Sequence, residues 1–106
     1  MRVIALKTLR EFYLKHPDSE QKLKAWYKEA EHSLWKSPQE IKRRYPNASV
    51  IQDNRVVFNI KGNSYRLVVK FNYKYGWGWI RFIGTHGEYD KINAEKYNSD
   101  ECCKSY

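Results

Sequence analysis

The stretch RVVFNIKGNSYRLVVKFNY, residues 55–73, decides the fold, because hydrophobic and polar residues alternate in it on both sides of a turn sequence. Alternation with a period of two is typical of strands with one buried face, and Gly62-Asn63 between two such runs predicts a β-hairpin. A turn at this pair places Ile60 opposite Tyr65. The hairpin then has one apolar face: Val56, Phe58, Ile60, Tyr65, Leu67 and Val69.

A third strand of this sheet is predicted over residues 77–83, after a turn at Tyr75-Gly76. This turn continues the apolar face into the new strand, with two expected pairs: Phe71 opposite Ile80, and Val69 opposite Phe82. A slip of one residue would move a charged side chain onto that face. The buried face therefore selects the register.

The N-terminal part of the chain has the spacing of helices instead. An apolar i, i+3, i+7 pattern ends at His16-Pro17 and predicts a first helix. Asp18, followed by Gln21 three residues later, predicts the N-cap of a second helix. That helix has an apolar stripe, which is expected to pack into the core: Leu23, Trp26, Tyr27, Ala30 and Leu34.

Two shorter elements complete the predicted fold. Ser37, with Glu40 three residues later, forms a second capping-box pattern, and Pro38 stands at the first helical position. This pattern predicts a short third helix that ends before Pro46. Residues 1–5 are interpreted as an initial strand. The chain is therefore predicted to be α+β, with N-terminal helices packed on one face of a small antiparallel β-sheet. Residues 1–92 would form this domain, and residues 93–106 a polar C-terminal tail.

The composition favours a folded, basic protein. Of the 106 residues, 42% are hydrophobic and 16% are aromatic, which is enough for one core, and the formal net charge is +8. Residues 61–91 contribute six of the Lys and Arg residues against two acidic ones. Such a surface favours a polyanionic partner, because neutralised phosphates release counterions. The alternative is a solvated basic surface that only aids solubility.

Several classes of protein and site are not supported by the sequence. The apolar runs are too short to span a bilayer, and the N-terminus reaches a charge too early for a signal peptide. The adjacent Cys102 and Cys103 suit neither a disulfide between them nor a zinc site. His86, Glu88 and Asp90 lack a further histidine or cysteine nearby in sequence. We therefore expect no metal site, no cofactor, no membrane contact and a cytoplasmic location.

The same register places basic side chains together on the opposite, uncovered face of the sheet: Lys61, Arg66, Lys70 and Arg81. Lys70 is expected opposite Arg81, and Arg66 opposite Thr85 and beside Asn59. Like charges across neighbouring strands destabilise a sheet, so this arrangement indicates a ligand. An RNA backbone, with a base stacked on Trp79, would satisfy it. The alternative is that the flexible side chains spread into solvent.

Residues 84–91, GTHGEYDK, place acid and base groups beside this basic face. Cleaving RNA without a metal requires a base near the 2′-OH, an acid at the 5′-oxygen and cations around the developing charge. Of the three histidines, only His86 is expected beside the basic face. Tyr89 is a second candidate for proton transfer or for stacking on a base. Arg66 and Arg81 suit charge stabilisation, since arginine stays protonated. A purely structural role remains the alternative for His86.

Two ordered segments resemble a known family: FNIKGNSYRL at residues 58–67 and IRFIGTHGEYDK at residues 80–91. They closely resemble the HigB-type toxins of the RelE-like superfamily of messenger RNA interferases. The resemblance covers nearly the whole chain, including the helix with Trp26-Tyr27, and weakens after Ile92. It implies a RelE-like microbial ribonuclease toxin fold and cleavage of messenger RNA on the ribosome. It also implies a helix-turn-helix, HigA-like antitoxin, with operator DNA contacted only through that antitoxin.

The family's functional residues are carried over only where this sequence matches. Arg66 matches the strand arginine of the superfamily. His86 falls where many RelE-like members have a catalytic arginine or histidine, and Tyr89 falls near a tyrosine that is catalytic in several. Arg81 and Lys91 match the HigB-type pattern.

The sequence departs from the family in two places. Gly87 stands where alanine is common, and residues 73–79 form an unusual aromatic turn, YKYGWGW. The first departure affects how His86 is positioned, and the second affects which surface the turn contacts.

The leading hypothesis is a ribosome-dependent endoribonuclease toxin with four catalytic residues: Arg66, Arg81, His86 and Tyr89. The residues expected to hold RNA are Lys61, Lys70, Trp79 and Lys91. Two alternatives stay open: a non-catalytic RNA- or ribosome-binding module, and an inactive toxin that acts as a co-repressor with its antitoxin. A neighbouring gene for a helix-turn-helix protein would favour the toxin and co-repressor hypotheses over the binding module.

Overall fold

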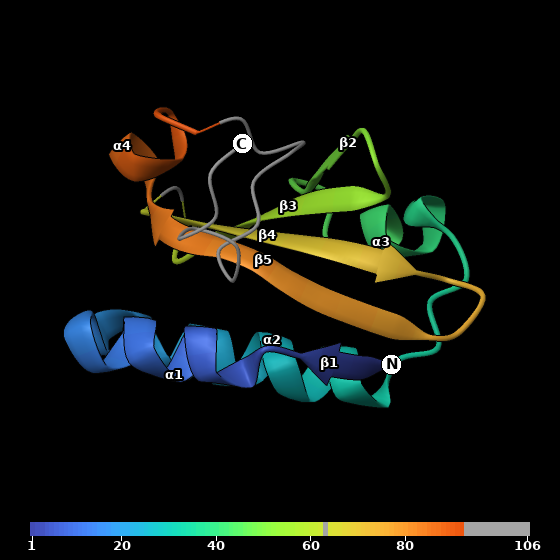
Figure 1. Ribbon diagram of the computed structural model, residues 1–106, viewed down its shortest axis with the longest axis horizontal. Helices are drawn as coiled ribbons and strands as arrows, with labels where there is room; N and C mark the ends of the chain where they lie inside the picture. Colours follow the sequence, from blue (N-terminus) through green and yellow to red (C-terminus); the bar gives the residue numbers. More distant parts are fainter. Residues whose placement is uncertain (63, 93–106) are drawn as a thin grey trace, which may run out of the picture.

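A five-stranded sheet with the strand order β1-β5-β4-β3-β2 forms the centre of the fold (Figure 1). The computed structural model describes residues 1–62 and 64–92, so the predicted tail lies outside the described residues. The strands are β1 Arg2–Ile4, β2 Ser49–Ile51, β3 Arg55–Ile60, β4 Tyr65–Asn72 and β5 Trp77–Thr85. All neighbours are antiparallel except β1 and β5. The α+β class is confirmed, but the sheet is mixed, because three helices separate β1 from the rest of the sheet and allow a parallel pairing.

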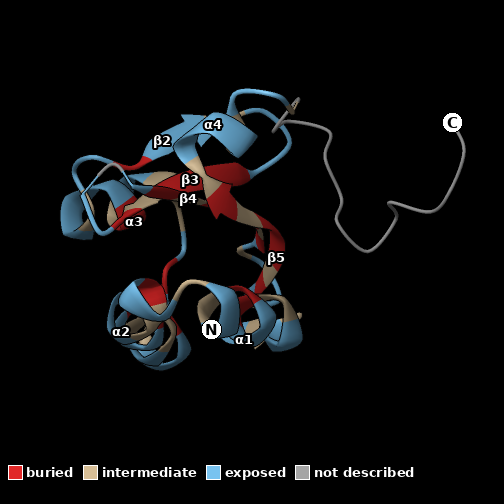
Figure 2. Cartoon of the chain, turned by 90° about the vertical axis from the view of Figure 1, so that its left-hand side faces the viewer, coloured by how far each residue is buried: buried red, intermediate tan, exposed pale blue. Residues whose placement is uncertain are grey.

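Two helices cover one face of the sheet, and a short helix lies on its other side (Figures 1 and 2). The helices are α1 Leu6–Lys15, α2 Glu20–His32, α3 Pro38–Arg44 and α4 His86–Tyr89, with a 3₁₀ turn η1 at Pro17–Ser19. The α1–α2 pair packs on the sheet as the apolar stripes predict. In residues 1–62 and 64–92, no helix is both long and apolar enough to cross a bilayer.

The main core lies between the α1–α2 pair and the sheet. Phe58 is its aromatic centre, with ring centroids 5.3 Å from Trp26, 5.2 Å from Tyr45 and 6.2 Å from Phe71. The predicted stripe on α2 is confirmed at its buried members, Leu23, Trp26 and Ala30. Leu34 was expected to belong to it but is 81% exposed, since α2 ends at His32.

The predicted cap of α2 is wrong. Because Pro17 begins a 3₁₀ turn, α2 starts at Glu20, and Asp18 caps no helix in this structure. The Asp18 carboxylate instead accepts hydrogen bonds from Lys61 Nζ at 2.7 Å and from Tyr65 Oη at 2.7 Å. These bonds, the one from Lys61 above all, lower the pKa of Asp18. The contact joins the helical half to the turn between β3 and β4. By contrast, Ser37 caps α3 as predicted.

The predicted register of β3 and β4 is confirmed. Val56 pairs with Val69, Phe58 with Leu67, and Ile60 with Tyr65. The apolar alternation and the turn agree on this register, since the turn residue Gly62 has a φ of +65°.

The predicted register of β4 and β5 is wrong. Phe71 pairs with Gly78 and Val69 with Ile80, because residues 73–76 form a four-residue turn. Asn72 closes that turn by accepting bonds from Tyr75 N at 3.1 Å and from Gly76 N at 2.8 Å.

A β-bulge adds a second correction to this pair of strands. Ile80 pairs with Val69 and Phe82 with Val68, so Arg81 is an extra residue on β5. Beyond the bulge the faces of β5 are exchanged, and Phe82 lies on the face away from α1 and α2. There it packs with Val57 and Val68 in a second, smaller apolar cluster.

Candidate functional site

The face of the sheet away from α1 and α2 carries basic and aromatic side chains in two groups. The α4 cluster lies at the end of β5 and consists of Arg66, His86 and Tyr89. The Trp79 cluster lies nearer the β4–β5 turn and consists of Arg55, Lys70, Trp79 and Arg81. The second apolar cluster, Val57, Val68 and Phe82, lies between them. The predicted basic face therefore exists, but it is divided.

Arg66 is held in place within the α4 cluster by contacts on both sides. On β3, Asn59 pairs with Arg66, as the predicted register placed it, and Asn59 Oδ1 accepts a hydrogen bond from Arg66 Nη1. On β5, Arg66 pairs with Gly84 rather than with the expected Thr85. The guanidinium carbon lies 5.9 Å from the centroid of the Tyr89 ring. Arg66 and Tyr89 are thus brought together, and the guanidinium stays near the surface.

A single helical turn, α4, positions His86 and Tyr89. Thr85 and Glu88 form a reciprocal capping box: Thr85 N donates to Glu88 Oε1 at 2.8 Å, and Glu88 N donates to Thr85 Oγ1 at 3.2 Å. His86 N donates to Ser64 O at 3.2 Å, which ties α4 to the β3–β4 turn. His86 and Tyr89 are neighbours at i and i+3 on this turn. The capping box and the bond to Ser64 together hold α4 in place at the end of β5.

His86 faces solvent and is paired with a carboxylate. Its Nδ1 lies 3.2 Å from Asp90 Oδ2, and 52% of its side chain is exposed. A carboxylate at one ring nitrogen orients an imidazole and leaves the other nitrogen available to a substrate. Asp90 was not among the predicted site residues, although its i+4 spacing from His86 on a helix would have indicated it.

The bulge determines the geometry of the Trp79 cluster. Trp79, rather than the expected Arg81, pairs with Lys70 across the strands. Arg81 is buried, with only 6% of its surface exposed. Its guanidinium carbon lies 3.7 Å from the centroid of the Trp79 ring, a close cation–π contact. Lys70 Nζ lies 3.0 Å from Asp53 Oδ2. The repulsion expected between Lys70 and Arg81 is thus reduced by an aromatic ring and a carboxylate.

The sequence prediction missed Arg55 as a member of this face. Arg55 is 2% exposed, pairs with Lys70 in the β3–β4 ladder, and has its Nε 3.7 Å from Asp53 Oδ2. In the predicted hairpin register, the pair that follows Val56 and Val69 is Arg55 and Lys70. Extending the register by this one pair would have identified Arg55. Asp53 therefore lies between two cations, which stabilises their close approach.

Two predicted RNA-binding lysines lie outside both clusters. Lys61 is bonded to Asp18 of η1, so its expected position in the basic cluster is wrong. Lys91 is exposed after α4, where its backbone N donates to Glu88 O at 3.2 Å. Among residues 1–62 and 64–92, no three His, Cys, Asp or Glu side chains come close enough to hold a metal ion. Cys102 and Cys103 lie outside this range.

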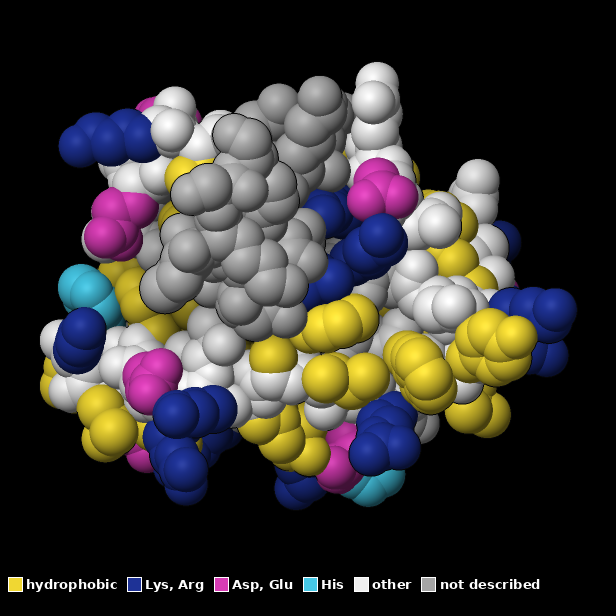
Figure 3. Space-filling model, in the orientation of Figure 1, with side chains coloured by type: hydrophobic (Ala, Val, Ile, Leu, Met, Phe, Trp, Pro, Cys, Tyr) yellow, Lys and Arg dark blue, Asp and Glu magenta, His cyan; other side chains and the backbone are white. Residues whose placement is uncertain are grey.

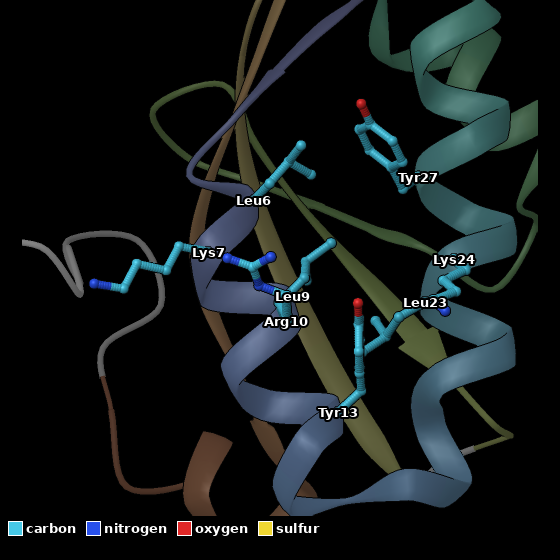
Figure 4. Close-up of a pocket in the computed structure, with 8 residues that line it drawn as sticks. All are labelled: Leu6, Lys7, Leu9, Arg10, Tyr13, Leu23, Lys24 and Tyr27. Atoms are coloured by element: carbon cyan, nitrogen blue, oxygen red, sulfur yellow. The ribbon is translucent and has the colours of Figure 1, made fainter.

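A separate cavity of about 440 Å³ lies between α1 and α2, on the helical side of the sheet (Figure 4). Its apolar floor includes Leu9 and Leu23, and Lys24 on its rim is paired with Glu20 at 2.5 Å. None of the predicted site residues lines this cavity. The acid and base groups of interest are on the other face.

The comparisons with a family model and with individual proteins agree on one family. Residues 19–92 match the family model of HigB_toxin, the RelE-like toxic component of a toxin–antitoxin system. The mRNA interferase toxin HigB of Escherichia coli strain K12 is 29% identical over 96 residues, which cover 89% of this chain and 92% of the relative. The mRNA interferase HigB of Shigella flexneri has the same identity and coverage. A further mRNA interferase HigB, from Escherichia coli O6:H1, is 23% identical over 94 residues, 87% of this chain and 91% of the relative.

Proposed function

This chain belongs to the HigB family of RelE-like toxins, and we propose that it cleaves messenger RNA as a metal-independent endoribonuclease. The observation that carries the proposal is the α4 cluster, in which a one-turn helix carries His86 and holds Tyr89 beside Arg66. The relatives named mRNA interferases support the same activity.

The α4 cluster supplies the groups that cleavage by the 2′-OH needs. One group takes the 2′-OH proton as the oxygen attacks phosphorus, and another gives a proton to the departing 5′-oxygen, which leaves a 2′,3′-cyclic phosphate. His86, oriented by Asp90, and the Tyr89 hydroxyl share these two roles. Arg66 stabilises the negative charge that develops on the phosphate oxygens.

The Trp79 cluster holds the RNA at a distance from the bond that is cut. Arg66 and Lys70 are four residues apart on β4, which is about 13 Å at ~3.3 Å per residue. Arg81 lies beside Lys70 and against the Trp79 ring, so in this proposal it supports the RNA-binding surface instead of stabilising the transition state. Lys91 contributes a further cation at the α4 end. Lys61 has no part in this face, because its ammonium group lies at Asp18 of η1, in the helical half of the molecule.

The partners follow from the family and from the substrate. The proposed substrate is messenger RNA on the ribosome, in the cytoplasm, and the proposed inhibitor is a helix-turn-helix antitoxin of the HigA type. Operator DNA is then contacted through the antitoxin alone. Family membership supports an antitoxin partner, and the basic face supports a polyanionic substrate.

Induced expression tests the proposed activity directly. We expect growth to stop and translated messages to be cut, with cleavage sites mapped by primer extension on RNA from induced cells. Co-expression of the protein encoded next to this gene should restore growth if that protein is the antitoxin. Intact messages in cells that contain folded, soluble protein would exclude the ribonuclease and leave a module that only binds.

Binding of RNA should weaken steeply as salt rises. About four or five phosphate contacts, with a slope of ~0.7 per contact for single strands, lower the affinity roughly 50- to 130-fold for a four-fold rise in salt. Fluorescence anisotropy with a labelled 2′-O-methyl oligonucleotide measures this, since the methyl group blocks cleavage. A flat response between low and physiological salt would contradict the assignment of the basic face to RNA.

A further inference from the structure

The basic face continues beyond the Trp79 cluster into a cavity of about 470 Å³ at the β4–β5 turn. Its lining combines aromatic rings, cations and amides: Asn54, Lys70, Phe71, Asn72, Tyr73, Lys74, Trp77, Trp79 and Arg81. Figure 3 shows hydrophobic side chains along β5 towards this turn, with Lys and Arg side chains beside them. The aromatic turn at residues 73–79 forms one wall of this cavity.

The WGW sequence at residues 77–79 places two indoles on the same side of β5, because side chains alternate along a strand. Gly78, between them, is buried opposite Phe71, and a Cβ atom there would lie 3.1 Å from the Phe71 ring. The glycine therefore lets the helical side of the strand pack tightly while both indoles face the cavity. Tyr73 adds another ring, stacked on Phe71 with centroids 5.7 Å apart.

Trp77 is the part of this wall that lies outside the core, and its ring lies against the surface ring of Tyr75, with centroids 5.7 Å apart. Trp77 is 43% exposed and belongs to neither apolar cluster of the described residues. Trp79, by contrast, has Arg81 against its ring. A large exposed aromatic beside cations is costly to leave in water and is typical of surfaces on which a base stacks.

The rim has charges and amides in positions that suit a nucleotide. Lys70 and Lys74 supply cations for a phosphate, and the side-chain amides of Asn54 and Asn72 can bond to the edges of a base. Three cations line this one cavity, Lys70, Lys74 and Arg81, and they favour a ligand that carries negative charge. An unpaired base with its phosphate satisfies the rings, the amides and the cations together.

We infer that this cavity binds one unpaired nucleotide of the RNA substrate, with its base on Trp77 and its phosphate at Lys70 and Lys74. The inference rests on the proposed ribonuclease function and adds a recognition site to it. The nucleotide bound here is not the one that is cut, because Trp79 and Thr85 pair with Lys70 and Tyr65, which are five residues apart on β4, roughly 16 Å. The cavity thus selects RNA by a base several positions from the scissile bond.

The test follows the four tryptophan indole N–H resonances by NMR while the full chain is titrated with single-stranded 2′-O-methyl hexamers of A, C, G or U. The signals of Trp77 and Trp79 should shift with at least one of these hexamers. Those of Trp26 and Trp35, which are buried in the core on the other side of the sheet, should stay in place. If neither Trp77 nor Trp79 moves with any hexamer, the cavity proposal is overturned.

Substitution at Trp77 supplies the matched control. Trp77→Ala should weaken binding of the best hexamer roughly ten-fold, because a stacked base loses its platform, while Trp77→Phe should keep most of the affinity. Unchanged Trp26 and Trp35 resonances in both variants report an intact fold. Equal affinity of the Ala variant and the parent overturns the inference. If messages are cut in cells but Trp77 and Trp79 never move, only the cavity fails. If the Trp77 and Trp79 signals shift but messages stay intact in cells, only the ribonuclease proposal fails.

Discussion

Replacing His86 by glutamine is expected to lower the rate of RNA cleavage by roughly a hundred- to ten-thousand-fold, the usual contribution of a general acid or base. Glutamine keeps a polar side chain of similar reach but cannot take up and release a proton near neutral pH. The affinity for RNA should barely change, because the phosphate contacts come from the lysines and arginines. The loss should therefore appear in the chemical step.

Single-turnover cleavage on programmed ribosomes, with ribosome binding measured separately, distinguishes these effects. Tyr89→Phe should cause a loss of similar kind if its hydroxyl moves a proton, and almost none if the ring only packs against Phe82 and Arg66. Asp90→Asn should lower the rate less than His86→Gln, since it affects only the orientation of the imidazole. Cleavage by His86→Gln at the parent rate would assign the histidine a structural role in α4.

Replacing Arg66 by alanine should lower the rate by about a hundred- to a thousand-fold, the loss seen when one donor to a developing negative charge is removed. The fold should survive, because Arg66 lies on the face away from the main core and its removal leaves no cavity there. Toxicity on induction should disappear while the protein remains soluble. The measurement combines the cleavage rate with a thermal melt.

Lys61→Ala is the matched control for the loss of a cation. It also removes one positive charge, but from a side chain that is bonded to Asp18 rather than placed in the α4 cluster. Its exposed ion pair contributes little to stability, so both the melt and the cleavage rate should stay near those of the parent. If Arg66→Ala melts far below Lys61→Ala, Arg66 supports the fold and its catalytic assignment is wrong.

The sequence by itself determined the elements whose pattern is local. Alternation in β3 and β4, with Gly62 in the turn, fixed a register in which a one-residue slip would expose the whole apolar face. The same register placed Asn59 beside Arg66. Ser37 capped α3 for an equally local reason, since the serine and the amide that it accepts from are three residues apart.

The candidate site could be predicted only where it depended on such patterns. Arg66, Lys70, Trp79, His86 and Tyr89 were named from parity and from the motif near the end of the last strand. Their division into two clusters was not predicted, because it depends on the bulge at Arg81. The apolar residues Ile80, Phe82 and Ile83 are compatible both with a regular strand and with a bulged one, so the sequence does not reveal the bulge. Val57 and Val68 provide the second apolar cluster that makes the new position of Phe82 favourable.

Only the tertiary structure decided the contacts between distant parts of the chain. Asp18 has the sequence of a helix cap, yet it bonds to Lys61 and Tyr65, more than forty residues away. The β1 strand pairs in parallel with β5, and no pattern within residues 1–5 specifies that partner. Arg55 is buried opposite Lys70 of the next strand, and Asp53 lies near both cations. Local sequence patterns predict the backbone geometry of neighbouring residues. The contacts named here depend instead on which groups from other parts of the chain the fold brings within a few ångströms.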